Sequence, residues 1–269
     1  MELLLTFLLL TYEFLKAIQL MKAIIKVRSR NYTTNLAKPL DISMPLRGDA
    51  ANVNVWYVAP PVIMPHTEDG FVGAVREGAS INFNDICFNP HAHGTHTECA
   101  GHITEEFMSV NQKLQQFFFL AEVITIAPEK LGDDFVISKK QLQYALGNKK
   151  REAVVIRTLP NLSDKMSRQY SHTNPPYLLE EGAEFLKERE VEHLLIDLPS
   201  VDREKDEGAL VSHRAFWNFK GKIRENATIT ELVYVNNSII DGTYLLNLQV
   251  APFENDASPS RPVLYKVEE

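Results

Sequence analysis

Two apolar runs joined by an amphipathic helix do most to limit how this chain can fold. Residues 154–160 (VVIRTLP) are rich in β-branched side chains, which is typical of a strand buried on both faces of a sheet. Residues 177–190 carry apolar side chains at the spacing of one helix face, namely Leu178, Leu179, Ala183 and Leu186. This expected helix leads directly into a second apolar run, HLLIDLPSVD (193–202). The strand–helix–strand order predicts a mixed α/β architecture.

The rest of the chain predicts more strands than helices. A shorter helix is expected at 139–147, where a glycine stands at the C-cap position. Further strands are expected at residues 22–27, 38–48, 53–64, 72–88, 120–128, 229–235, 244–252 and 261–267. The 269 residues are 45% hydrophobic, which is enough for one large core. We therefore expect residues 21–269 to form a single α/β domain with few flanking helices.

Residues 1–20 (MELLLTFLLLTYEFLKAIQL) differ from the rest of the chain. Glu2, Glu13 and Lys16 interrupt their apolar run, which makes it too short and too charged for a standard membrane span. No basic residue precedes the run and no small-residue cleavage site follows it, which disfavours a signal peptide. We interpret the segment as an N-terminal extension, either an added helix or the result of a start codon placed too early.

The charge balance argues against two classes of partner. The 28 basic and 35 acidic residues leave a formal net charge of −7. This balance gives no electrostatic reason to expect binding to nucleic acid or to an anionic membrane. Cys87 and Cys99 are too few for a disulfide framework, although they leave one disulfide open. The composition favours a reduced, cytoplasmic setting.

A cluster of histidines is the clearest functional signal. Four of the eight histidines lie within twelve residues of the segment NPHAHGTHTECAGHI (89–103). Histidine and carboxylate are the usual ligands of zinc, manganese and iron. His96, Glu98 and His102 all have even numbers, so they would share one face if the chain stayed extended. The alternative is a set of exposed or core histidines unrelated to metal.

The cluster resembles the signature of the cyclase family, whose best-known members are bacterial kynurenine formamidases. That signature is H-x-G-T-H-x-D-x-P-x-H, and the positions that match it are Gly94, Thr95, His96 and His102. The positions that depart from it are Ala92 for the first histidine, Glu98 for the aspartate and Ala100 for the proline. Other similar segments extend the resemblance from about residue 38 to the C-terminus: DISMPL (41–46), IDLPSVD (196–202), His213, Glu231 and SPSRPVLY (258–265).

The resemblance implies a set of site residues. It makes metal ligands of His96, Glu98, His213 and Glu231, and it makes His102 the catalytic acid/base. The histidine missing at Ala92 would have to be replaced by one of its neighbours. A one-residue bulge near Gly94 would bring either His91 or His93 into the site. We favour His91 as the further metal ligand, because Pro90 would help to fix a bend there.

The resemblance also implies an activity and a cofactor. We expect a metal-dependent hydrolase of a small amide, formamide, lactam or ester, similar to the arylformamidases, with one or two Zn²⁺ or Mn²⁺ ions. A bound metal lowers the pKa of water and polarises a carbonyl, and His102 would take a proton from that water and give one to the leaving amine. Two alternatives stay open: a non-catalytic binding protein that has lost the first ligand, and a metal-dependent cyclase or dehydratase.

The resemblance also implies a fold and an oligomeric state. The fold would be a swivelling β/β/α-type domain with a strand-rich, barrel-like central sheet. The chain would form a homodimer or a higher homo-oligomer. Among the residues near the motif, we expect Cys99 to be a buried packing residue. We expect Asp197 and Asp202 to bond to a turn or to a ligand histidine rather than to the metal.

Overall fold

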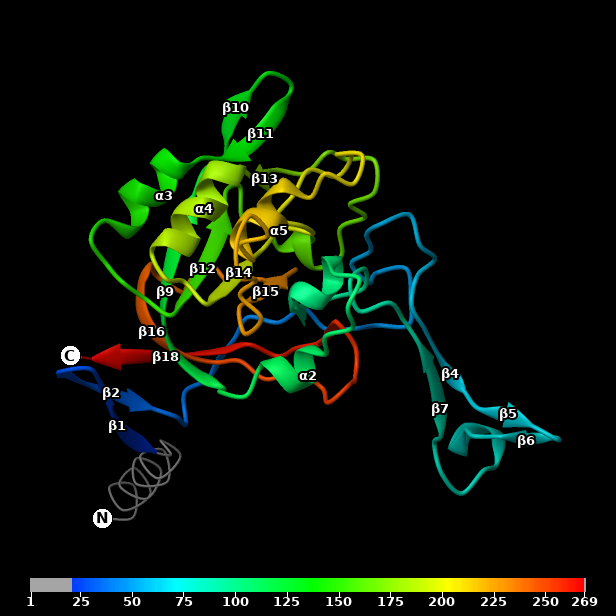
Figure 1. Ribbon diagram of the computed structural model, residues 1–269. Coiled ribbons are helices and arrows are strands. Elements are labelled where there is room, and N and C mark those ends of the chain that lie inside the picture. Colours follow the sequence, from blue (N-terminus) through cyan, green and yellow to red (C-terminus); the bar gives the residue numbers. More distant parts are fainter. Residues whose placement is uncertain (1–20, 269) are drawn as a thin grey trace, which may run out of the picture.

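The structure is a computed structural model that describes residues 21–268, so the extension expected at residues 1–20 lies outside the described residues. One mixed sheet, eleven-stranded within the described residues, runs through the molecule (Figure 1). Its strands follow one another across the sheet in the order β1 (Lys22–Val27), β2 (Arg30–Asn35), β18 (Val263–Glu268), β16 (Gly242–Asn247), β9 (Phe118–Ile126), β12 (Ala153–Thr158), β14 (His193–Ile196), β15 (Thr228–Glu231), β8 (His96–Glu98) and β17 (Ala257–Pro259). The short strand β3 (Leu40–Asp41) pairs with β18.

The centre of the sheet consists of parallel strands whose connections contain helices. Strands β9, β12, β14 and β15 are parallel neighbours. The connections between them carry α3 (Lys139–Leu146), α4 (Glu180–Glu188) and α5 (Val211–Phe216), which lie together on one face of the sheet (Figure 1). Helix α3 begins with a capping box, in which the Ser138 hydroxyl accepts from Gln141 N–H and the Gln141 side chain accepts from Ser138 N–H. These features confirm the mixed α/β architecture predicted from the sequence.

The central strands are apolar on both faces. In β12, Val154 and Ile156 pack towards the helices, whereas Ala153 and Val155 pack into a second core on the opposite face. Burying both faces requires the continuous β-branched sequence from which this strand was predicted. Two separate cores, one on each side of the sheet, follow from this pattern.

Several predicted elements are shorter than expected, for identifiable reasons. The helix expected at 177–190 begins only at Glu180, because Pro175 and Pro176 lead the chain into the short strand β13 (Tyr177–Leu178). Strand β13 completes a small sheet with β10 (Glu129–Leu131) and β11 (Asp134–Ile137). The strand expected at 53–64 is interrupted because Trp56 and Tyr57 take positive φ values of 59° and 60°. Of the segment 38–48, only β3 is a strand.

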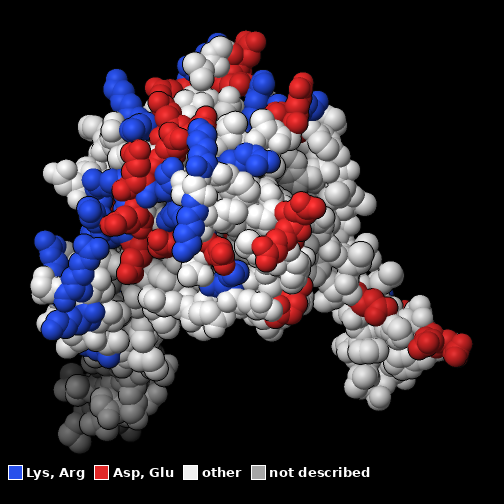
Figure 2. Space-filling model, in the orientation of Figure 1, with Lys and Arg blue, Asp and Glu red and all other residues white. Residues whose placement is uncertain are grey.

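The segment expected as one strand at 72–88 belongs to an arm formed by residues 62–87. Strand β4 (Val62–Pro65) pairs with β7 (Asn84–Cys87), and β5 (Thr67–Glu68) pairs with β6 (Phe71–Val72). A 3-10 turn, η1 (Val75–Glu77), lies between β6 and β7. The arm projects from the body of the molecule (Figure 1), and in Figure 2 most of its surface is uncharged.

Two expectations about the sheet and the cysteines can be compared with the structure. The strand path ends at β1 and β17, and no pairing within residues 21–268 joins these two strands, so the expected barrel-like closure is not shown. Cys87 and Cys99 are both free thiols. The remaining helical turns are α2 (Val110–Lys113), η2 (Ala100–Ile103) and η3 (Ser163–Met166). None of the helices in the described part of the chain is long and apolar enough to cross a membrane.

Candidate metal centre

Strands β8 and β15 bring three of the expected site residues onto one face. The two strands are antiparallel neighbours, and Glu231 lies directly opposite His96. Since side chains alternate along a strand, Glu98 projects from the same face as His96. The other face is occupied by Thr97 and Thr230, whose hydroxyl groups lie 2.8 Å apart. The even-number argument made from the sequence therefore holds for His96 and Glu98.

Helix α5 supplies His213 from the opposite side. The carboxylate of Asp202 accepts hydrogen bonds from the backbone N–H of Ser212 at 2.7 Å and of His213 at 3.2 Å, at the start of this helix. The same carboxylate accepts from His213 Nδ1 at 2.6 Å. His213 Nε2 is thereby turned towards Glu98 Oε1 at 3.1 Å and Glu231 Oε1 at 3.7 Å. Asp202 thus holds a candidate ligand histidine, one of the two roles expected of it.

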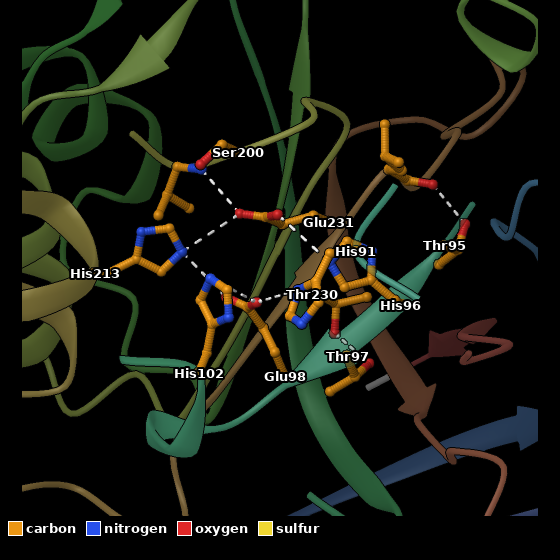
Figure 3. Close-up of polar contacts among 12 residues, drawn as sticks. His91, Thr95, His96, Thr97, Glu98, His102, Ser200, His213, Thr230 and Glu231 are labelled. Atoms are coloured by element: carbon orange, nitrogen blue, oxygen red, sulfur yellow. Dashed lines mark hydrogen bonds and ion pairs between the residues drawn. The ribbon is translucent and has the colours of Figure 1, made fainter. Parts of the chain in front are cut away.

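The buried wall of the site consists of four residues: His96, Glu98, His213 and Glu231. All four are buried, and Figure 3 shows the rings of His96 and His213 directed towards the two carboxylates. His96 Nε2 lies 3.5 Å from Glu231 Oε2. His96 Nδ1 donates to the carbonyl oxygen of Gly94 at 3.0 Å. The backbone N–H of Val201 donates to Glu231 Oε1 at 2.9 Å, which fixes this carboxylate in place.

His91, and not His93, lies in the cluster. Its Nδ1 is 3.2 Å from Glu98 Oε2. The ring of His93 is used elsewhere, since its Nδ1 accepts from Asn89 N–H at 2.8 Å and its Nε2 donates to the carbonyl of Ala59 at 2.9 Å. The expected bulge is replaced by a turn, in which Ala92 N–H donates to the carbonyl of Asn89 at 3.2 Å. Pro90 occupies the second position of this turn, where proline is favoured, and His91 follows it with its ring in the cluster.

His102 also reaches the cluster, but not through an extended chain. The strand ends at Glu98 and the backbone turns into η2, so the even-number argument does not apply to His102. Its ring stacks on His91 with centroids 4.3 Å apart. Its Nε2 is 3.8 Å from Glu98 Oε2.

Asp256 is a member of the site that the sequence argument missed. Its Oδ2 lies 2.8 Å from His91 Nε2 and 3.3 Å from His102 Nδ1. No spacing in the sequence signalled it, because it reaches the site only through the pairing of β17 with β8. His91, His102 and Asp256 form the exposed wall of the site, with 20%, 30% and 25% of their side chains exposed.

Charge pairing dominates the electrostatics of the cluster. Burial alone would raise the pKa of Glu98, but the charge of His102, a hydrogen bond from His213 and the ion pair with His91 hold that pKa well below its usual range. Burial opposes protonation of His213, yet bonding to Asp202 and Glu98 raises its pKa well above the ordinary value. The pKa of His91 is raised to about 10, because its bonds to Asp256 and Glu98 outweigh the effect of burial.

The donor set fits a divalent metal. His96 Nε2 and Glu98 Oε2 are buried and make no hydrogen bond. Their polar contacts, to Glu231 Oε2 at 3.5 Å and to His91 Nδ1 at 3.2 Å, are ion pairs. Candidate ligand atoms lie within 4.8 Å of one another in three overlapping groups: His91, His96 and Glu98; Glu98, His102 and His213; and His91, His102 and Asp256. Imidazole and carboxylate ligands at such distances suit zinc and manganese. Glu98, which stands in place of an aspartate, contacts both walls, through Oε1 to His213 and through Oε2 to His91.

Two other residues near the motif lie outside the cluster. The buried carboxylate of Asp197 pairs with Lys165 Nζ at 2.7 Å and accepts from Thr158 N–H and Oγ1. Cys99 is buried, and its Sγ donates to the carbonyl of Met108 at 3.4 Å. Burial raises the pKa of Cys99 to about 11, so it stays a thiol at neutral pH. The expectation that Cys99 is a packing residue is confirmed.

Known proteins share the sequence pattern and the fold of this chain. The family model described as "Putative cyclase" matches residues 40–203. The isatin hydrolase A of Labrenzia aggregata, solved with benzyl benzoate, is similar at a TM-score of 0.61 and 15% identity, over 86% of this chain and 94% of that chain. A predicted metal-dependent hydrolase from Bacillus stearothermophilus is similar at a TM-score of 0.59 and 17% identity, over 85% and 98% of the two chains. A structure described as a novel cyclase has a TM-score of 0.62 and 13% identity, over 87% and 90%. No curated protein matches.

The family match covers only part of the site. Residues 91–102 and Asp202 lie within the matched span, whereas His213, Glu231 and Asp256 lie beyond it. The last three are therefore assigned to the cluster by the geometry of the fold.

Proposed function

The chain belongs to the cyclase family, and on that premise we propose that it is a metal-dependent hydrolase of a small amide, formamide, lactam or ester. The observation that carries this proposal is the pair of buried atoms without a hydrogen bond, His96 Nε2 and Glu98 Oε2. A buried polar atom that lacks a hydrogen bond costs free energy, so such atoms are rare unless something binds them. Here both atoms belong to residue types that ligate metals, and they face the same cluster.

The buried wall and His91 would hold the metal. His96 Nε2, His213 Nε2 and His91 Nδ1 all face Glu98 or Glu231, so each ring presents one nitrogen to the same space. We propose Zn²⁺ or Mn²⁺ as the cofactor, with one or two ions bound. When bound, such a metal supplies an activated water and polarises a substrate carbonyl.

His102 is placed to move the proton. Its Nε2 lies 3.8 Å from Glu98 Oε2, and 30% of its side chain is exposed to solvent. A ring in this position can accept a proton from an attacking water and return it to the leaving nitrogen or oxygen of the substrate. We propose His102 as the general acid/base, with Nε2 as the reacting atom.

The exposed wall limits how the substrate enters. Because His91, His102 and Asp256 are the partly exposed members of the cluster, a substrate approaches from their side. Phe88 and Phe253 stand three residues from His91 and Asp256, and their rings are 6.2 Å apart. We propose an aromatic substrate, because this ring pair offers an aromatic contact close in sequence to two residues of the exposed wall. The likeness to an isatin hydrolase supports the cyclic amide within this class, because isatin is a lactam. An arylformamidase-like activity remains the second substrate class to test.

The first test is the metal content of the purified chain, measured by elemental analysis. We expect one or two equivalents of zinc or manganese in the parent protein and in His66→Ala, a control histidine on the arm, but not in His96→Ala. A screen of N-formylanilides, lactams and aryl esters should then find turnover. His102→Gln should lower this turnover by about 10²- to 10⁴-fold and leave the metal bound. Absence of metal after incubation with zinc and manganese would instead favour a non-catalytic binding protein.

We also propose that the chain acts in the cytoplasm as a homodimer or higher homo-oligomer, with the arm as a contact surface between copies. The two free cysteines support the location. A ribbon of only two paired strands is marginal on its own. The arm nevertheless exposes many large apolar side chains: Val62, Ile63, Met64, Phe71, Val75, Ile81, Phe83 and Ile86. Exposed apolar patches of this kind mark contact surfaces.

Light scattering coupled to size-exclusion chromatography tests the assembly. We expect the parent chain to have the mass of two or more copies, and Ile86→Lys to reduce that mass. Leu131→Lys serves as the control, because Leu131 is an equally exposed apolar residue on a different hairpin. A monomeric parent chain, or an Ile86→Lys variant of unchanged mass, contradicts this role of the arm.

A further inference from the structure

One carboxylate oxygen contacts both histidines of the exposed wall. Asp256 Oδ2 lies 2.8 Å from His91 Nε2 and 3.3 Å from His102 Nδ1. The two rings are stacked, with an angle of 30° between their planes. Their other nitrogens both face Glu98 Oε2, at 3.2 Å for His91 and 3.8 Å for His102. Each ring therefore spans the same two carboxylates, one buried and one partly exposed.

The same division of nitrogens occurs at every histidine of the cluster. His213 gives Nδ1 to Asp202, and His96 gives Nδ1 to the carbonyl of Gly94, so both present Nε2 to the centre. A ring nitrogen that donates to an outer acceptor carries the proton, which leaves the inner nitrogen free to bind a metal or to take up a proton. For His91 and His102, Asp256 is the outer acceptor.

The position of Asp256 is built into the backbone. It directly precedes β17, whose Ala257 pairs with Glu98. The carbonyl of Asp256 accepts from Cys99 N–H at 3.0 Å, and the carbonyl of Asn255 accepts from Val110 N–H at 2.9 Å. The carboxylate is thus fixed relative to Glu98 by main-chain contacts on both sides, so its two contacts with the rings are not those of a free surface side chain.

From this geometry we propose that Asp256 is a positioning residue for both rings of the exposed wall. It holds the proton of His91 on Nε2, so that Nδ1 is free to bind a metal, and it holds the proton of His102 on Nδ1, so that Nε2 is free to accept a proton. The proposal rests on the proposed function for the roles of the two rings. The double contact of Asp256 does not depend on that function.

Nuclear magnetic resonance of the histidine rings, recorded on the full chain with and without zinc, tests the proposal. Long-range proton–nitrogen spectra show which ring nitrogen carries the proton, and the signals are assigned with His91→Gln and His102→Gln. In the zinc-loaded parent chain we expect His91 protonated at Nε2 and His102 at Nδ1. Asp256→Asn should shift the signals of both rings, and it should weaken zinc binding by about 10- to 100-fold, the usual cost of losing an outer partner of a ligand.

Asp134→Asn is the matched control, because Asp134 is a partly exposed aspartate bonded to Asn174, Tyr177 and Arg203, outside the cluster. It should change neither the ring signals nor the zinc affinity. If Asp256→Asn does not fold, Asp256→Glu, which keeps the charge and displaces the oxygen, must still shift both signals. Unchanged ring signals in the folded Asp256 variant overturn the proposal. If the parent chain binds no zinc but both signals shift in the metal-free spectra, the proposed hydrolase function fails and the double contact of Asp256 stands.

Discussion

The buried and exposed walls of the site are made of similar residues but are built in different ways. The buried wall comes from strands β8 and β15 and from helix α5, whose positions are set by the main sheet. The exposed wall comes from a turn, from η2 and from the residue that precedes β17. The comparison teaches that regular elements supply the buried part of the site, whereas irregular segments supply the part that is open to solvent.

Glu98 belongs to the buried wall and also pairs with His91 and His102 of the exposed wall, so its removal should have the largest effect. In Glu98→Gln the charge that faces His91, His102 and His213 is lost. Losing a residue that only bonds to a metal ligand typically weakens metal affinity by about 10- to 100-fold, and we expect a larger fall in zinc affinity here. Titration calorimetry of the metal-free protein measures this loss.

Glu122→Gln is the control for a general effect of neutralising a buried carboxylate. Glu122 is equally buried, but its partners Lys149 and Arg151 lie outside the cluster. This variant should lose stability and keep its metal. A Glu98→Gln protein that binds zinc as tightly as the parent would show that the two walls do not share a metal through Glu98.

A histidine of the site and a histidine of the core should change the stability of the protein with pH in opposite directions, which sharpens the comparison between the site and the core. The pKa of His91 is raised to about 10 by Asp256 and Glu98 against the effect of burial. The stabilisation from this ring is therefore complete below the ordinary histidine pKa of 6.5 and is lost as pH rises towards 10. His213, whose pKa is also raised, adds to the same loss. We expect the free energy of unfolding of the metal-free protein to fall above pH 6.5, by at most about 1.4 kcal/mol per pH unit for each ring.

Urea unfolding at a series of pH values, with a chelator and with zinc, measures this dependence. Zinc should flatten the alkaline fall, because a metal replaces the ring protons and binds more tightly as pH rises. His91→Gln should remove part of the fall in the metal-free protein. An alkaline fall that is identical in His91→Gln contradicts the assignment.

His193 in the core should produce the opposite dependence, a loss of the free energy of unfolding at acid pH. Burial, together with the positive charge of Arg224, lowers its pKa to about 3. Its contribution is present above the ordinary value of 6.5 and is lost as pH falls towards 3, because only the unfolded chain then takes up the proton. The same unfolding series should show a smaller acid loss in His193→Gln than in the parent. A parent chain without acid loss in this range would contradict the burial of a neutral ring on β14.

The regular part of the molecule could be predicted from the sequence, for physical reasons. A strand buried on both faces must be apolar throughout, so β12 and β14 were visible as apolar runs, and α4 was visible from its periodicity. Strand β2 was missed because its sequence, RNYTTN, is polar, although it lies between β1 and β18 in the sheet. Helix α5 was missed because six residues are too few to show a helical period. The arm was expected to be simple strands, because its exposed apolar residues look like core residues in the sequence.

The site residues also divide into those that a regular strand made predictable and those that irregular segments bring into the site. The alternation of side chains in a strand placed His96 and Glu98 on one face, and the structure has them there. His102 was expected in the site for the wrong reason, since a 3-10 turn rather than an extended chain brings it inward. Asp256 could not be predicted, because its contact with His91 depends on a pairing between β8 and β17, which are distant in the sequence. The roles of all these residues remain predictions until the metal is measured.

The smallest expected effect on metal binding concerns Ala92, where the family signature has its first histidine. Ala92 is fully buried, and the exposed wall already has an imidazole, His91, one position earlier. Ala92→His should therefore not improve metal binding. A larger side chain in a packed interior typically costs about 1–3 kcal/mol, so we expect a loss of stability of that size in urea unfolding.

Ala59→His is the control, because it adds a histidine at an exposed position in the neighbouring loop. This substitution should leave both stability and zinc affinity unchanged. If Ala92→His bound zinc more tightly than the parent at equal stability, the added ring would be acting as a ligand, and His91 would belong to the solvent edge rather than to the metal. If Ala92→His is destabilised and binds no better, the turn at residues 89–92 has replaced the family histidine with its neighbour, and the exposed wall of this chain is built around His91.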